Sequence, residues 1–210
     1  MDGQIAPKAM ANRQESWWLP ATWIAAQIRR AFALSVAVML VIGAGACSSS
    51  APAASSLNPL PAHLLGLSKS TNPDAQALAS AFAQTQTPRE GAFVHSGQAA
   101  LYGGSGAGFQ IYAASLTSTG ASAAASAGYA VSAKAIVAGS GSKDLQSFPA
   151  GPHGGALYCS HTTTLSGGTV IDCGWVDQTA VGTVAYNRGS AASLGDAASK
   201  TNKIRATIEP

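Results

Sequence analysis

Apolar and polar residues alternate in three short runs between Ala156 and Tyr186, which is the pattern of half-buried β-strands. The runs read ALYCSHTTT, TVIDCGWV and VGTVAY, and the turn-forming residues Ser166-Gly167-Gly168 and Asp177-Gln178-Thr179-Ala180 separate them. We therefore predict an antiparallel meander. If the first turn centres on Ser166, Cys159 lies directly opposite Cys173. The same register pairs Leu157 with Trp175 and His161 with Ile171 on that face, and Tyr158 with Gly174 on the other.

The preceding chain predicts one helix, one hairpin and a second helix. Thr71-Asn72-Pro73-Asp74 has the residue types that begin a helix, with Leu78 and Phe82 on one apolar side and an end at Thr87-Pro88. Strand-like runs at 92–102 and 109–117 flank a glycine-rich turn at 103–108. The alanine-rich stretch 120–138 predicts a helix, and 139–155 predicts a loop.

A closing helix is expected over 190–208. Apolar residues recur at helical spacing there, and Asp196 and Lys200 form an i,i+4 pair of opposite charge. Strands that follow one another and helices gathered at both ends of the domain predict an α+β fold. Its antiparallel sheet combines the C-terminal meander with the earlier hairpin and is flanked by helices.

The sixteen residues from Ala31 to Ala46 carry no charge and follow Arg29-Arg30. As a helix they would be about 24 Å long, which is short of a hydrocarbon core of about 30 Å. This length favours a signal peptide over a membrane span, and the basic residues before it direct the following chain outwards. Arg29-Arg30-Ala31-Phe32 also resembles part of a twin-arginine export signal, which is an alternative to general secretion.

The residues Ala44-Gly45-Ala46-Cys47 resemble a bacterial lipobox. The resemblance implies that Cys47 is lipidated and becomes the first residue of the mature protein, with acyl chains that hold it at the membrane. An uncleaved signal anchor and free secretion are the alternatives. We expect a signal peptide or anchor at 1–46, a flexible tether at 47–70 and an extracytoplasmic domain at 71–210.

Charged residues are only 10% of the chain, and the formal net charge is +3. Four basic and two acidic residues precede Cys47, which leaves eight basic and seven acidic residues after it. Binding to nucleic acid needs a clustered positive charge, and the exported part lacks that excess. We therefore expect no nucleic acid among the partners. The leader and Cys47 make the membrane the expected partner.

Cys159 and Cys173 are the two cysteines that remain besides Cys47. Residues directly opposed on neighbouring strands lie within disulfide range, and exported proteins fold in oxidising surroundings. We predict a disulfide between them, which contributes about 3 kcal/mol in the chain-entropy estimate for a loop of this size.

About forty residues around these cysteines resemble exported or membrane-anchored proteins of actinobacteria whose function is unknown. The shared pattern consists of Gly154-Gly155, Cys159, Cys173-Gly174-Trp175-Val176-Asp177 and Gly182. The resemblance implies a location in the cell envelope and paired cysteines, and it implies nothing about a substrate.

Candidate chemistry in the exported part is sparse. His153, Cys159 and His161 are residue types that bind zinc or copper, but Cys159 is expected in the disulfide, so we predict no metal site and no cofactor. Trp175 is expected in the core, Asp177 in the turn that follows it, and Asp172 on the solvent side of its strand.

No serine lies in a Gly-x-Ser-x-Gly elbow. We therefore predict no catalytic residue and favour a non-catalytic envelope module that binds or senses a ligand or partner. The alternatives are an envelope hydrolase that uses His95, His153 or His161, and a structural protein of the cell wall.

Overall fold

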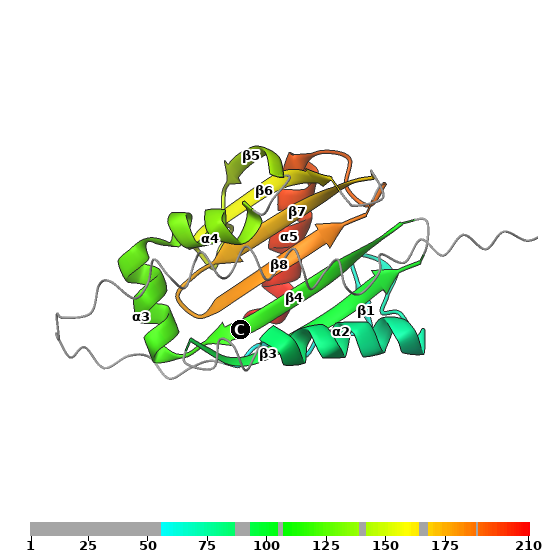
Figure 1. Ribbon diagram of the computed structural model, residues 1–210, viewed down its shortest axis with the longest axis horizontal. Coiled ribbons are helices and arrows are strands. Elements are labelled where there is room, and N and C mark those ends of the chain that lie inside the picture. Colours follow the sequence, from blue (N-terminus) through cyan, green and yellow to red (C-terminus); the bar gives the residue numbers. More distant parts are fainter. Residues whose placement is uncertain (1–55, 87–92, 105–106, 139–141, 164–167, 188) are drawn as a thin grey trace, which may run out of the picture.

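The computed structural model describes residues 56–86, 93–104, 107–138, 142–163, 168–187 and 189–210. Within these ranges the chain forms four helices, a two-stranded sheet and a six-stranded antiparallel sheet (Figure 1). The α+β prediction is confirmed. In chain order the elements are β1 (His63–Leu64), β2 (Leu67–Ser68), α2 (Pro73–Gln86), β3 (Val94–Gly103), β4 (Gly108–Leu116), α3 (Ser118–Ala127), α4 (Tyr129–Val137), β5 (Ser142–Phe148), β6 (Ala156–Thr163), β7 (Thr169–Val176), β8 (Ala180–Tyr186) and α5 (Leu194–Ile208).

The larger sheet has the strand order β3-β4-β8-β7-β6-β5, so the expected hairpin and the expected meander meet where β4 pairs with β8. The register of β6 on β7 is the predicted one throughout. It places Cys159 opposite Cys173, Leu157 opposite Trp175 and His161 opposite Ile171, with Tyr158 opposite Gly174. Alternation of side chains along each strand therefore defines two faces of the sheet.

Helix α5 covers one face and lies behind the sheet in the view of Figure 1. Ser193 begins the helix by accepting a hydrogen bond from the backbone N–H of Asp196, and the predicted pair of Asp196 and Lys200 forms at 2.8 Å. The apolar side of α5 packs against the disulfide and aromatic residues of the sheet. The buried residues of this core include Leu194, Ala198, Ile204, Ile208, Ile111, Trp175, Val184 and Tyr186.

Two helices, α3 and α4, lie on the opposite face. The single helix expected over 120–138 is wrong, because the chain breaks at Gly128, which has a φ of 82°. Gly128 ends α3 and also begins α4, so the two short helices can follow different directions over the sheet. Gly174 lets α4 approach β7 closely, since a Cβ at this position would lie 2.6 Å from Val137 Cγ2.

The loop expected over 139–155 is also partly wrong. Residues Ser142–Phe148 form β5, the strand at the edge of the sheet beside β6. The pairing shifts between Lys143 and Gln146, and Asp144 adopts a φ of 56° there. This irregular, polar strand does not show the alternation that identified its neighbours, which is why the sequence pattern missed it.

The expected tether is too long, because its second half belongs to the folded domain. Leu60 and Leu64 are buried in the core beneath α5, and the backbone N–H of Asn58 donates to the carbonyl of Ile208. The side-chain amide of Gln98 on β3 makes two hydrogen bonds with this segment. It donates to the carbonyl of Asn58 and accepts from the N–H of Leu60. The sequence suggested a tether because Pro and Ser dominate here, but the few leucines are sufficient for packing.

Helix α2 begins as predicted. The side chain of Asn72 accepts hydrogen bonds from the N–H groups of Asp74 and Ala75, and Pro73 is the first helical residue. The side chains of Leu78 and Phe82, the expected signal helix and Cys47 lie outside the described part of the structure. Among the described helices, none combines the length and the apolar character that crossing a membrane requires.

Candidate functional site

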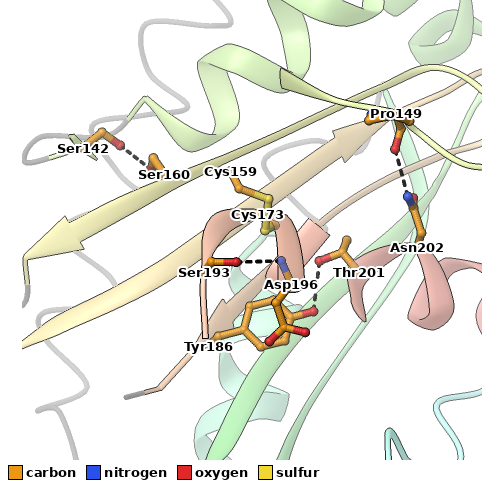
Figure 2. The surroundings of a disulfide bond; sticks show 10 residues. All are labelled: Ser142, Pro149, Cys159, Ser160, Cys173, Tyr186, Ser193, Asp196, Thr201 and Asn202. Carbon is orange, nitrogen blue, oxygen red and sulfur yellow. Dashed lines mark hydrogen bonds between the residues drawn. A yellow bond between two sulfur atoms is a disulfide. The ribbon is translucent and has the colours of Figure 1, made fainter. Parts of the chain in front are cut away.

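The predicted disulfide joins β6 and β7 between the sheet and α5 (Figure 2). The sulfur atoms are 2.07 Å apart and the Cα atoms 4.1 Å apart. Both cysteines are fully buried, so neither sulfur is accessible to a thiol in solution. The bond is a structural cross-link of the core rather than a redox centre.

Two glycines of the C-terminal pattern make room for Trp175 and the turn after it. A Cβ on Gly182 would lie 2.3 Å from the Trp175 ring, and a Cβ on Gly155, whose φ is 79°, would lie 2.2 Å from the carbonyl oxygen of Val176. Only a glycine allows these approaches. Trp175 is fully buried as predicted, and its ring lies 5.9 Å from the guanidinium carbon of Arg205.

Arg205 is the centre of a buried ionic network that the sequence reasoning missed. Its guanidinium donates to Asp177 Oδ2 at 2.7 Å and to both carboxylate oxygens of Glu209, at 2.9 and 3.1 Å. It also donates to the carbonyls of Ala150 and Gly154. All three charged residues are almost fully buried. The sequence contains one indication of this network: Arg205 lies on the apolar side of α5, four residues after Thr201 and four before Glu209.

Asp177 shapes the turn between β7 and β8, as predicted. Its Oδ1 accepts hydrogen bonds from the N–H groups of Thr179 and Ala180 and from the Thr179 hydroxyl. Its other oxygen, Oδ2, accepts a hydrogen bond from Arg205, so both carboxylate oxygens have donors. Because the partners of Arg205 occupy its hydrogen-bonding groups within the core, we assign this network to structure and not to ligand binding.

His153 lies at the rim of the network, with Nδ1 3.5 Å from Glu209 Oε2 and a side chain that is 23% exposed. Burial raises the pKa of Glu209, and the hydrogen bonds from Arg205 oppose this rise. The other imidazole contacts are more exposed: His161 Nδ1 lies 3.7 Å from Asp144 Oδ2, and His63 Nδ1 lies 3.2 Å from Ser68 Oγ across the β1–β2 hairpin.

Asp172 provides a second charged site, on the face of the sheet opposite the disulfide. The expectation that it faces solvent is wrong, since α3 and α4 partly cover this face and leave Asp172 half-buried. Burial raises the pKa of its carboxyl to about 6 from an ordinary 3.8, and a hydrogen bond with Thr162 opposes the rise. Within the described chain, no lysine, arginine or histidine forms a salt bridge with this carboxylate.

The neighbouring serines do not supply a second donor to Asp172. Ser142 Oγ donates to the carbonyl of Val137 at 2.6 Å and lies 3.0 Å from Ser160 Oγ (Figure 2). A hydroxyl has one hydrogen, so Ser160 must be the donor in the pair of serines. The hydroxyl hydrogen of Ser160, the direct cross-strand neighbour of Asp172, is therefore already used.

The side chains beside Asp172 in the same row remain partly accessible. Asp172 pairs with Ala185 on β8, which pairs with Gln110 on β4, and Thr183 lies one step along the same face. All four are half-buried. We refer to Gln110, Asp172, Thr183 and Ala185 as the open sheet face.

The part of the chain that the structure describes contains no group of three or more His, Cys, Asp or Glu residues arranged to hold a metal ion. Of the three candidate ligands, Cys159 is in the disulfide and His161 contacts Asp144 instead.

No family model, no curated protein and no solved structure matches this chain.

Proposed function

We propose that the protein is a membrane-tethered extracytoplasmic module that binds a ligand or partner of the cell envelope without catalysing a reaction. The open sheet face is the observation that carries this proposal. It combines a carboxylate that has no ionic partner among the described residues with two neutral polar side chains that keep contact with solvent. Helix α5 closes the other face of the sheet by apolar packing, whereas these side chains are partly accessible and can reach a ligand.

The envelope location is supported by the uncharged leader before Cys47 and by the buried disulfide, which forms in an oxidising compartment. A lipid on Cys47 would hold the domain at the membrane. The resemblance of the C-terminal pattern to exported actinobacterial proteins points to the same location.

The arrangement of the imidazoles favours binding over hydrolysis. Within the described residues, no hydrogen bond joins His95, His153 or His161 to a serine or threonine hydroxyl, as a nucleophile and its base would require. The Ser68–His63 pair is an exposed contact between opposed residues of a hairpin, and no carboxylate orients this imidazole in the described chain.

The proposal is tested by saturable sedimentation of the full-length protein, in detergent micelles, with the envelope fraction of the cells that produce it. Thr183→Arg fills the open sheet face, and we expect it to weaken binding at least tenfold. Ser199→Arg, on the exposed side of α5, is the matched control and should bind like the wild type.

Equal binding by Thr183→Arg, or no saturable binding by the wild type, would contradict the proposed function. Binding to purified wall polymer that Thr183→Arg does not affect would instead support a structural role in the wall. Release of a cleavage product that depends on a histidine would support the hydrolase.

A further inference from the structure

The carboxylate of Asp172 can accept more hydrogen bonds than its described neighbours donate to it. Among the described residues the carboxylate has one hydrogen-bond donor, the hydroxyl of Thr162, for two oxygens that can each accept more than one hydrogen bond. The hydroxyl of Ser160 donates to Ser142, which itself donates to Val137, so its oxygen faces this region only as an acceptor. Within the described residues, part of the acceptor capacity of the Asp172 carboxylate is therefore unused.

The nearby end of α4 adds negative potential. Val137 is its last residue, and the carbonyl groups at the C-terminal end of a helix carry a partial negative charge. This end packs on Gly174, which lies two residues from Asp172 on the same face of β7. Lys134, the basic residue in the last turn of α4, is exposed and forms no salt bridge with Asp172.

We propose that the open sheet face binds the ammonium group of a ligand, with the carboxylate of Asp172 as its ionic partner. An ammonium group supplies up to three donors and the missing positive charge. A divalent metal ion fits less well, because Asp172 is not part of any group of three or more potential His, Cys, Asp or Glu ligands in the described chain. Thr183, diagonally across from Asp172 on β8, and Gln110, two strands away in the same row, would contact the remainder of the ligand.

This inference rests on the proposed function and names the chemical class of its ligand. Carboxylates whose ionisation is opposed by burial are frequent at functional sites, and a bound cation would offset that cost at Asp172.

The experiment uses n-butylammonium as the probe and n-butanol as its neutral counterpart. Full-length protein in detergent micelles, with ¹³C at the aspartate carboxyl carbons, is titrated by NMR, and the signal of Asp172 is assigned from its loss in Asp172→Asn. We expect n-butylammonium to shift this signal saturably at pH 8 and n-butanol to leave it unchanged. Since the pKa of Asp172 is about 6, the affinity should be about tenfold weaker at pH 5.

Two variants separate the ionic contact from a general change in the domain. Asp172→Asn should weaken saturable binding of n-butylammonium, followed at the backbone amides, at least tenfold. Asp144→Asn removes an exposed carboxylate from β5 and should bind like the wild type. Ala185→Lys keeps Asp172 but places an ammonium group directly across from it, so we expect it to block the probe and to lower the pKa of Asp172.

Equal shifts with n-butanol, unchanged affinity in Asp172→Asn or Ala185→Lys, or a carboxyl that remains protonated at pH 8 would overturn the inference. If Thr183→Arg abolishes envelope binding and Asp172→Asn does not affect it, the proposed function is supported and the contact between Asp172 and an ammonium group is contradicted. If neither variant affects envelope binding, the proposed function and the ammonium contact are both contradicted.

Discussion

Two acidic residues on β7 and in the turn that follows it have opposite surroundings. Asp177 is buried beside Arg205 and accepts hydrogen bonds at both oxygens. Asp172 lies on the other face, keeps partial contact with water and has no ionic partner in the described chain. Desolvation therefore disfavours both charges, but ionic and hydrogen-bonding partners offset this cost at Asp177, whereas one hydrogen bond from Thr162 offsets it at Asp172 within the described chain.

The Asp172→Asn substitution should stabilise the protein at high pH. The folded-state pKa of about 6 exceeds the ordinary value of 3.8, so the contribution of Asp172 to stability is fully present below about pH 4 and is lost as the pH rises through 6. One pKa unit corresponds to about 1.4 kcal/mol, and Asp172 keeps some contact with water, so we expect a gain of about 1–2 kcal/mol at pH 8.

This gain should shrink towards zero at pH 4. Urea unfolding followed by circular dichroism at the two pH values measures it, with Asp144→Asn as the control. An equal effect of Asp172→Asn at both pH values would show that its carboxyl is not desolvated.

The elements of the domain are held together by a few residues whose contacts cross from one element to another. Arg205 on α5 binds the turn after β7 through Asp177 and the segment before β6 through the carbonyls of Ala150 and Gly154. Asn202, one turn earlier on α5, adds a bond to the carbonyl of Pro149 (Figure 2). Tyr186 and Thr201 connect β8 to the same helix, 3.0 Å apart. The position of α5 therefore depends on polar contacts as well as on its apolar side.

Replacing Arg205 with Met should strongly destabilise the fold. The substitution keeps an apolar chain of similar length but leaves Asp177 and Glu209 buried without a cation, which costs about 3–5 kcal/mol. Lys203→Met, at an exposed position of the same helix, is the matched control and should change stability by less than about 0.5 kcal/mol. Comparison of the two urea midpoints checks this, and similar midpoints would contradict the central role of Arg205.

The first described residues are bound to the C-terminal helix of the domain. Asn58 is bound to the end of α5, and Leu60 is already in the core. Asn58 lies eleven positions after Cys47, which corresponds to a reach of at most about 40 Å. A lipid on Cys47 would therefore keep this end of the domain near the membrane surface.

Substitution of Cys47 with Ala should release the protein from the membrane fraction, because the acyl chains could no longer be attached. The measurement is the distribution of the protein between membrane and soluble fractions after export. Ser49→Ala preserves the attachment site and should remain with the membrane. Retention of Cys47→Ala would indicate an uncleaved signal anchor in place of lipidation.

Local sequence patterns were sufficient for the elements that depend on neighbouring residues. The alternation in β6 and β7 determined their register and hence the disulfide between Cys159 and Cys173, because a shift by one residue would turn every side chain to the other face. The capping residues Asn72 and Ser193 act within one helical turn, so the starts of α2 and α5 follow from the chain itself.

Only the tertiary structure decided which segments far apart in the sequence meet. Leu60 packs beneath α5 although about 130 residues separate them, and Arg205 finds Asp177 across 28 positions. Asp172 is half-buried because helices from another part of the chain cover its face. Local periodicity does not predict these contacts. The burial of a residue depends on which distant segment packs against it in the folded domain. The candidate binding site therefore became visible only in the folded domain.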